Sequence, residues 1–241
     1  MLIAGTARNI ALYWNNTKES LQCIMDSIED GFYHIVIIES NSEDRTLPLL
    51  QEWSALDPLR RTVVSMGVLT NPCRTTRLAT CRNKYMDLCE PLFGLHKEMM
   101  IVDLDNAIDV DRSNFQAQLT SCFSTTHQWD AIASNRRGRY YDVWALRSRA
   151  MGITFDCWST INSGQGTVEN CVKPFQKKIE ENADWIACES AFGGMALYKT
   201  AAIRGRRYDG SRTCEHVSFH DGLRIFINPS LISGGECLEH L

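Results

Sequence analysis

Short apolar runs alternate with helical patterns along the first half of the chain. The run His34–Glu39 is continuous and β-branched, as in strands that are buried on both faces of a parallel sheet. In the segments between such runs, apolar residues recur every three or four positions, which places them on one helix face. The predicted strands cover 2–4, 34–39, 62–64 and 99–102, and the predicted helices cover 17–28, a stretch within 40–56, and 75–88.

The second half of the chain is less regular. Its predicted strands cover 129–134, 143–146, 195–198 and 225–227, and its predicted helix covers 168–181. We find no internal repeat, low-complexity tract or linker, so we expect one domain over 1–241. The alternation predicts an α/β fold with a mixed, mainly parallel central sheet flanked by helices, and ligands outside the carboxyl ends of its strands.

The composition is that of a soluble globular protein, with 44% hydrophobic and 22% charged residues. The 25 Lys and Arg residues are outnumbered by 29 Asp and Glu, for a formal net charge of -4. Because nucleic-acid binding needs a basic surface, this balance argues against a nucleic-acid partner. No apolar run approaches the ~18 residues that span a bilayer, so we expect no membrane span either.

Ten cysteines are spread along the chain, and none belongs to a CxxC pair. This spacing argues against zinc ribbons and zinc fingers, and in a chain this long the even count does not imply a disulfide framework. We expect most of these cysteines to be reduced and buried, which favours a cytoplasmic protein. The N-terminal sequence MLIAGTARNIALYW also lacks the basic and apolar regions of a signal peptide.

The strongest chemical signal is the segment MMIVDLDN at 99–106. An apolar strand there delivers two carboxylates, Asp103 and Asp105, to one end of the predicted sheet. Carboxylate oxygens suit Mg²⁺ or Mn²⁺, and the oxygens of a diphosphate can complete the coordination shell. The pair therefore predicts a site for a divalent metal and a diphosphate.

The same acids have three other interpretations. A calcium loop is disfavoured because its sixth position holds Ile108 rather than Gly, and its twelfth holds Asn114 rather than Glu. An aspartyl-nucleophile phosphatase would need Thr or Val where this chain has Ala107. The structural alternative is a set of surface acids that cap a helix starting near Asp111.

Two segments of the first half carry candidate nucleotide-binding groups. Glu39 begins ESNSEDRT, where acidic and hydroxyl side chains at a strand end can hold the base and ribose of a nucleotide. Arg74 and Arg77, at the start of a predicted helix, can hold phosphate. The alternatives are a capped helix for the first segment, which does not explain Glu39, and solvated helix charges for the second.

A further candidate segment is CEHVSFH at 214–220. Its two histidines, His216 and His220, stand four positions apart and can bind a metal if the segment is helical. Glu215 is a candidate general base beside them. The alternative is that both histidines are structural.

The order and spacing of these segments resemble a known family. ESNSEDRT, Arg77-Leu78 and Arg82-Asn83 are similar to motifs of GT-A glycosyltransferases, in particular the fungal capsule-type α-mannosyltransferases. The later motifs of the resemblance are Val102–Asn106, YDVWALR at 141–147, GGMALY at 193–198, CEH at 214–216 and INP at 227–229. Together they extend over most of the chain, and their order is far more specific than any one of them.

The resemblance implies a GT-A (Rossmann-like) fold. It also implies transfer of a hexose or deoxyhexose from a UDP- or GDP-linked sugar to a hydroxyl of a glycan or oligosaccharide acceptor, with Mn²⁺ or Mg²⁺. Residues 1–106 would form the nucleotide-binding half and 107–241 the sugar and acceptor half. The residues that it places around the donor are Thr6, Arg8, Asn9, Glu39, Arg77, Asp103, Trp144 and Arg147. Asp103 and Asp105 would hold the metal, with His216 as a further candidate ligand.

The proton acceptor and the stereochemistry stay open at this point. Glu215 or Asp142 would take the proton of the acceptor hydroxyl if the reaction inverts the anomeric configuration, and no base is required if it retains it. Two other functions are a nucleotide-sugar or glycan-binding module without turnover, and the phosphatase named above. Fungal relatives are anchored in the Golgi, so an anchor outside this chain would place the protein in the Golgi lumen instead of the cytoplasm.

Overall fold

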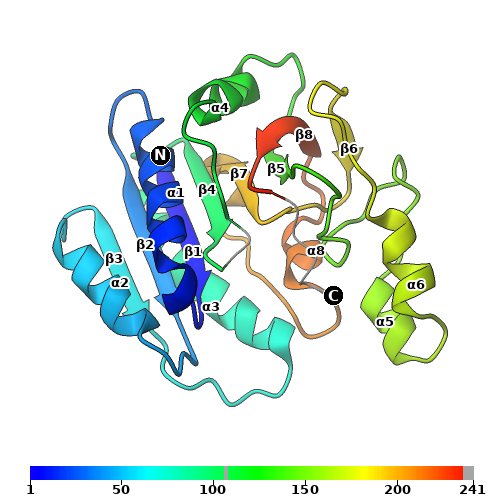
Figure 1. Cartoon of the computed structure of the whole chain (residues 1–241), viewed down its shortest axis with the longest axis horizontal. Coiled ribbons are helices and arrows are strands. Elements are labelled where there is room, and N and C mark those ends of the chain that lie inside the picture. The colour runs from blue at the N-terminus through cyan, green and yellow to red at the C-terminus, as the bar shows by residue number, and fades with distance from the viewer. Residues whose placement is uncertain (106–107, 236–241) are drawn as a thin grey trace.

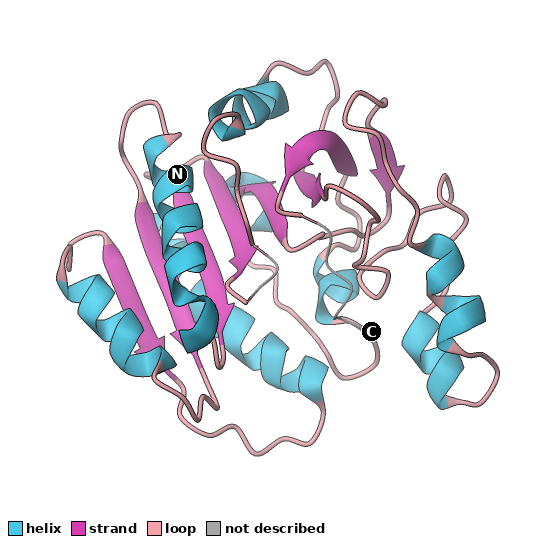
Figure 2. Cartoon of the chain, viewed as in Figure 1, coloured by secondary structure: helices cyan, strands magenta, loops and turns pink. Residues whose placement is uncertain are grey.

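The computed structural model describes residues 1–105 and 108–235, so Asn106 and Ala107 of the acidic segment lie outside the described residues. Its centre is an eight-stranded sheet with helices on both faces (Figures 1 and 2). The strands are β1 (Leu2–Ala7), β2 (His34–Glu39), β3 (Arg61–Ser65), β4 (Glu98–Asp103), β5 (Ala131–Asn135), β6 (Ile186–Cys188), β7 (Met195–Lys199) and β8 (Ile225–Ile232). This architecture confirms the predicted α/β class and its mixed, mainly parallel sheet.

The strand order is β3-β2-β1-β4-β7-β5-β8-β6. The strands β3, β2, β1 and β4 are mutually parallel, and β5 is parallel to β8. The strand β7 runs antiparallel to both β4 and β5, and β6 runs antiparallel to β8. The chain moves outward from β1 to β3 and then returns to place β4 on the other side of β1. The carboxyl ends of β1 and β4 therefore flank a topological switch point, where α/β sheets bind ligands.

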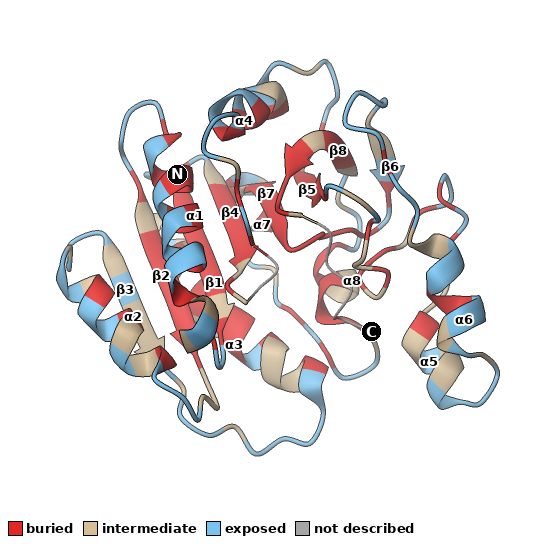
Figure 3. Ribbon diagram, viewed as in Figure 1, coloured by how far each residue is buried: buried red, intermediate tan, exposed pale blue. Residues whose placement is uncertain are grey.

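The inner strands β1, β2, β4, β5 and β7 are buried on both faces because helices cover both (Figure 3). One face packs against α1 (Trp14–Asp26), α2 (Thr46–Ala55) and α4 (Phe115–Phe123), and the other against α3 (Arg74–Cys89) and α8 (Glu215–Phe219). Side chains alternate along β1, so that Leu2 and Ala4 face α3 while Ile3 faces α1. This two-sided burial explains why the strands read as continuous apolar runs rather than alternating ones.

The remaining elements are short. They are η1 (Ala11–Tyr13), η2 (Glu90–Leu92), α5 (Cys157–Asn162), α6 (Val168–Cys171), η3 (Lys173–Phe175) and α7 (Thr200–Ile203). Figure 1 shows α5 and α6 together at the periphery, away from the sheet.

Predictions for the first half of the chain match the structure closely, whereas two predictions for the second half are wrong. The segment 143–146 forms turns instead of a strand, because Asp142 Oδ1 accepts a hydrogen bond from the Ala145 amide, at 3.3 Å, and folds the backbone. The predicted helix over 168–181 is limited to α6 and η3. Pro174 lies in η3, and proline lacks the N–H that would continue a helical ladder.

Two asparagines stabilise the loops that follow β1 and β2. Asn9 and Asn41 have positive φ angles of 52° and 57°, which asparagine tolerates better than most residues. The Asn9 side chain accepts from the Glu43 amide at 2.8 Å, and its amide donates to Ser42 Oγ at 3.2 Å. The two loops are thereby joined into one rim above the sheet.

The described residues also bear on cysteine chemistry and on membrane insertion. Each described cysteine is free, and all of them except Cys73 are buried, as expected for small apolar side chains. Within 1–105 and 108–235, no helix combines the length and the apolar character that crossing a bilayer requires.

Gly193 is a position where the fold requires glycine. Its φ is +70°, and an added Cβ would lie 2.3 Å from the carbonyl oxygen of Ser134. We expect Gly193→Ala to destabilise the protein by more than the about 1–2 kcal/mol that a left-handed conformation alone costs an L-residue. Gly205→Ala is the matched control, because its φ is +73° but the space around it is open. Thermal unfolding midpoints would test this, and equal shifts for the two variants would contradict it.

Candidate active site

Two adjoining cavities lie beyond the carboxyl ends of the central strands, at the switch point. The larger has a volume of about 360 Å³ and the smaller about 240 Å³. Their combined size suits a ligand larger than a single sugar. The side chains that line both are Arg74, Leu78, Arg82, Asp103 and Asp105. A ligand can therefore extend from one cavity into the other past the acidic pair.

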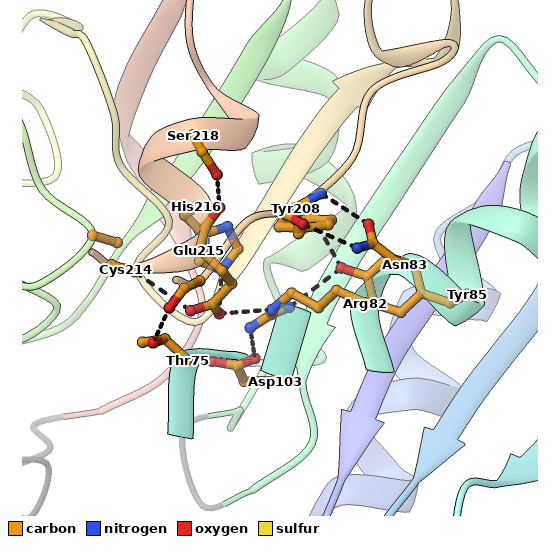
Figure 4. Close-up of polar contacts among 12 residues, drawn as sticks. Thr75, Arg82, Asn83, Tyr85, Asp103, Tyr208, Cys214, Glu215, His216 and Ser218 are labelled. Carbon is orange, nitrogen blue, oxygen red and sulfur yellow. Dashed lines mark hydrogen bonds and ion pairs between the residues drawn. The ribbon is translucent and has the colours of Figure 1, made fainter. Parts of the chain in front are cut away.

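A buried guanidinium lies at the centre of the polar contacts (Figure 4). Arg82, on α3, is 2% exposed and donates to Glu215 Oε1 through Nε and to Asp103 Oδ1 through Nη2, both at 2.9 Å. Its Nη1 lies 3.3 Å from the Tyr85 hydroxyl. Burial by itself lowers the pKa of Arg82, but Tyr85, Asp103 and Glu215 raise it well above its usual value. The charge is therefore permanent.

Aromatic rings complete the surroundings of Arg82. Its guanidinium lies over the rings of Phe192 and Tyr208, at 5.2 and 5.7 Å from their centroids. Tyr208 is in turn held by Asn83, which exchanges two hydrogen bonds with the Tyr208 backbone at 2.8 and 2.9 Å. The Arg82-Asn83 pair of the sequence motif thus ties α3 to β4 and to the segment that leads into α8.

The two acids of the predicted metal site lie where β4 ends. The Asp103 amide pairs with the Gly194 carbonyl at 2.9 Å, which fixes the end of the strand. The Asp103 side chain is 26% exposed, and Arg82 binds only its Oδ1. Within the described residues, no three His, Cys, Asp or Glu side chains form a metal-binding group, so His216 does not join the two acids in one cluster. The pair suits a metal whose remaining ligands come from a diphosphate or water.

Asp142 projects into the larger cavity from the loop after β5. Its Oδ2 accepts from the Gly193 amide at 3.0 Å, and its Oδ1 accepts from the Ala145 amide. Burial raises the pKa of Asp142 to about 6, and the nearby charges of Asp103 and Glu215 add to this rise. A carboxyl group with such a pKa changes its protonation state close to neutral pH.

Glu215 and His216 enter the same cavity from the start of α8. Both are buried, and the Nε2 of His216 lies 3.9 Å from Glu215 Oε1. The imidazole stacks on Phe192 at 4.1 Å, and neither ring nitrogen has a hydrogen-bond partner in the described structure. Burial, with Arg82 and His220 adding to it, lowers the pKa of His216 well below its usual value, so the ring is neutral.

His220 has a different environment from His216. Its ring nitrogens pair with Ser190 Oγ at 2.9 Å and with the Tyr198 hydroxyl at 2.8 Å. Burial lowers the pKa of His220 to about 3. Its hydrogen bonds give it a structural role, whereas His216 has unused hydrogen-bonding capacity.

The predicted donor-binding residues divide into two groups. Thr6, Arg8 and Arg77 line the smaller cavity with the acidic pair. Asn9 and Glu39 are not among its lining residues, since Asn9 joins the two loops and Glu39 accepts from Ser65 Oγ at 2.6 Å and from the Ser42 amide at 3.0 Å. These two residues hold the loops of the rim in place without lining the cavity.

The YDVWALR segment also contains one predicted residue that lines a cavity and one that does not. Trp144 lines the larger cavity, whereas Arg147 is turned away and donates to Asp156 Oδ2 at 3.2 Å and to Thr213 Oγ1 at 3.1 Å. Arg147 therefore supports the segment that leads to Glu215 instead of lining the cavity.

Sequence reasoning did not identify Tyr141, Trp158 and Phe192 as candidate site residues, although all three line the larger cavity. Trp158 lies on α5 and Phe192 in an irregular segment, so neither follows a strand whose end could have indicated a site. Tyr141 stands inside the recognised motif, but nothing local distinguishes it from a core aromatic residue.

Comparisons with known proteins agree on the fold. No protein-family model and no curated protein matches the sequence. Among solved structures, the chain is similar to the mannosyltransferase PcManGT from Pyrobaculum calidifontis in complex with GDP-Man and Mn²⁺, with a TM-score of 0.54 and 12% identity over 99% of this chain and 57% of that one. It is also similar to S. aureus TarS 1-349 in complex with UDP-GlcNAc, with a TM-score of 0.54 and 13% identity over 99% of this chain and 59% of that one.

A third similar structure is GalNAc-T7 with UDP, GalNAc and Mn²⁺. Its TM-score is 0.57 and its identity 13%, over 99% of this chain and 44% of that one. The chain spans less than two thirds of the length of each of these three proteins. At such identities the likeness establishes the fold, which is the GT-A fold of glycosyltransferases.

Arg82 should be important for stability because it neutralises two acids. We expect Arg82→Met to lower the free energy of unfolding by about 3–5 kcal/mol, since removing one partner leaves the buried carboxylate of Glu215 uncompensated. Arg112→Met, which breaks an exposed ion pair with Asp26, should cost about 1 kcal/mol or less. Urea unfolding of both variants measures the difference. Similar losses in the two would show that the buried network is not a main source of stability.

Proposed function

We propose that this protein is a metal-dependent glycosyltransferase. It transfers a hexose or deoxyhexose from a UDP- or GDP-linked sugar to a hydroxyl of a glycan acceptor. The observation that carries the proposal is the position of Asp103 and Asp105, which line both cavities at the switch point of a GT-A sheet. The ligands in the similar solved structures, which are GDP-Man, UDP-GlcNAc, UDP with GalNAc, and Mn²⁺, support the same chemistry.

The smaller cavity suits the nucleoside diphosphate. Arg8, Arg74 and Arg77 line it and supply positive charge for phosphate oxygens, while Thr6 comes from the end of β1 and Asn41 from the loop after β2. The larger cavity then receives the sugar, because it begins at the same acidic pair. The donor would extend across both.

Asp103 and Asp105 would hold the divalent cation, which supplies charge neutralisation for the departing diphosphate when it is bound. Arg82 positions Asp103 by binding its Oδ1 at 2.9 Å. The buried Arg82 also places a permanent positive charge beside the diphosphate subsite. Such a preorganised charge stabilises negative charge that develops during the reaction.

The contacts of the two candidate bases favour Asp142 over Glu215. Glu215 Oε1 already accepts from Arg82 Nε at 2.9 Å, so an ion pair occupies this oxygen. Among the described residues, Asp142 accepts from neutral backbone N–H groups alone, and the pKa of about 6 makes it an effective base at neutral pH. With Asp142 as the base, the reaction inverts the anomeric configuration.

The acidic pair can be tested by ligand binding as well as by turnover. We expect UDP- or GDP-sugars to raise the melting temperature of the protein only when Mn²⁺ is present, because a ligand of the native state stabilises it by mass action. Asp105→Ala should fold normally but lose both this shift and sugar transfer. Glu98→Ala, at the opposite end of β4, is the control. Wild-type turnover in Asp105→Ala would overturn the proposed metal site.

The assignment of Asp142 predicts a defined pH dependence. Because its pKa is raised to about 6, the carboxylate predominates above pH 6, and kcat/KM should fall as the pH drops below that value. Asp142→Asn should lower kcat by roughly 10²–10⁴-fold and abolish this acid limb. A pH profile of donor consumption measures both effects. Glu215→Gln should retain the acid limb, and its loss in that variant would transfer the role to Glu215.

A further inference from the structure

The larger cavity has two chemically different ends. One carries the acidic pair, Arg82 and Asp142, which the proposed reaction uses. The other is mainly apolar and aromatic, formed by Trp144 and Trp158 with Val143 and Val172, and the guanidinium of Arg74 lies 5.9 Å from the centroid of the Trp144 ring. The two indoles meet edge to face, with centroids 6.2 Å apart and planes at 71°. Because Trp158 belongs to the peripheral helix α5, this end lies at the outer wall of the site.

The cavity also contains polar atoms that lack partners. Within the described structure, the Nε1 of Trp144 and both ring nitrogens of His216 are buried and make no hydrogen bond. Trp144 Nε1 can only donate, while a neutral imidazole offers one donor and one acceptor. Buried polar atoms in native proteins are nearly always paired, so these three indicate a missing ligand with hydroxyl groups.

A ligand that packs on the indoles and also pairs these polar atoms needs an apolar face and a rim of hydroxyl groups. A pyranose ring has both. We propose that the aromatic end of the larger cavity is the acceptor subsite, where a pyranose packs on Trp158 and hydrogen-bonds with Trp144 Nε1 and His216. This inference rests on the proposed function, which reserves the acidic end for the donor. Asp142 immediately precedes the Val143-Trp144 part of the wall, so the base adjoins the bound ring.

The placement assigns His216 a role in specificity. Its stacking on Phe192 fixes the ring plane, and its neutral state lets one nitrogen accept from a hydroxyl while the other donates. A site built to hydrogen-bond a hydroxyl strongly rejects an analogue without it, because the buried polar atoms are then left unpaired. The acceptor is therefore a sugar with a hydroxyl at the position that faces His216, and not a peptide or an aliphatic alcohol.

Direct binding of simple pyranosides tests this subsite. The probes are the methyl pyranosides of mannose, glucose, galactose and xylose, added to protein saturated with a nucleoside diphosphate and Mg²⁺. Saturation-transfer NMR should show at least one of them bound, with the strongest transfer to the protons of one ring face. Trp158→Ala and His216→Phe should each weaken that pyranoside by roughly tenfold or more while the nucleotide affinity stays at the wild-type value.

Trp185→Ala is the matched control, because Trp185 is also half-buried but packs on His127 outside both cavities, and it should bind the pyranoside normally. The inference is overturned if no pyranoside binds the wild type, if both variants keep their pyranoside affinity, or if nucleotide affinity falls in parallel, which would assign the aromatic wall to the donor. Transfer to a Ser- or Thr-containing peptide in place of a sugar would also overturn it. A wild type that binds a pyranoside but no nucleotide sugar refutes the proposed function instead, and leaves the sugar subsite in place.

Discussion

The structure depends on the buried positive charge of Arg82. Taking a guanidinium out of water is costly, and the cost is offset only when opposite charges and hydrogen-bond acceptors surround it. Arg82 meets this condition with Asp103 from the end of β4, Glu215 from the start of α8 and two aromatic rings. Since the partners come from segments far apart in the chain, satisfying this one charge brings the two halves of the molecule together at the proposed site.

The same constraint organises the electrostatics of the larger cavity. Arg82 pairs with Glu215, whereas burial, with the charges of Asp103 and Glu215 adding to it, raises the pKa of Asp142. The charge of Arg82 also helps to keep His216 neutral. One cation thus leaves three neighbouring groups in three different states: a paired carboxylate, a carboxyl group that titrates near neutral pH, and a neutral imidazole with free nitrogens. In the proposed reaction, the paired carboxylate has a structural role, whereas the carboxyl group that titrates near neutral pH takes part in the chemistry.

Residues 1–105 show how much sequence patterns can reveal when local and tertiary preferences agree. The β-branched run at His34–Glu39 forms β2 with the predicted bounds, and the strand that ends in Asp103 was expected from apolar residues followed by acids. The second half lacks such agreement. The segment 143–146 is apolar because it lines a core and a cavity, and not because it pairs with a strand, so its pattern was misleading. The peripheral α5 and β6 are too short for periodicity to indicate them.

The sequence by itself determined the α/β class, the order of the main strands and helices, and the residue types that the proposed chemistry needs, because these follow from burial patterns and from local propensity. Only the tertiary structure decided which of those residues share a cavity. Arg147 and Glu39 turned out to support neighbouring segments, whereas Trp158 and His216 line the cavity itself. The physical reason is that burial, charge pairing and unpaired hydrogen-bonding groups arise from contacts between segments distant in the chain, and no local pattern encodes these contacts.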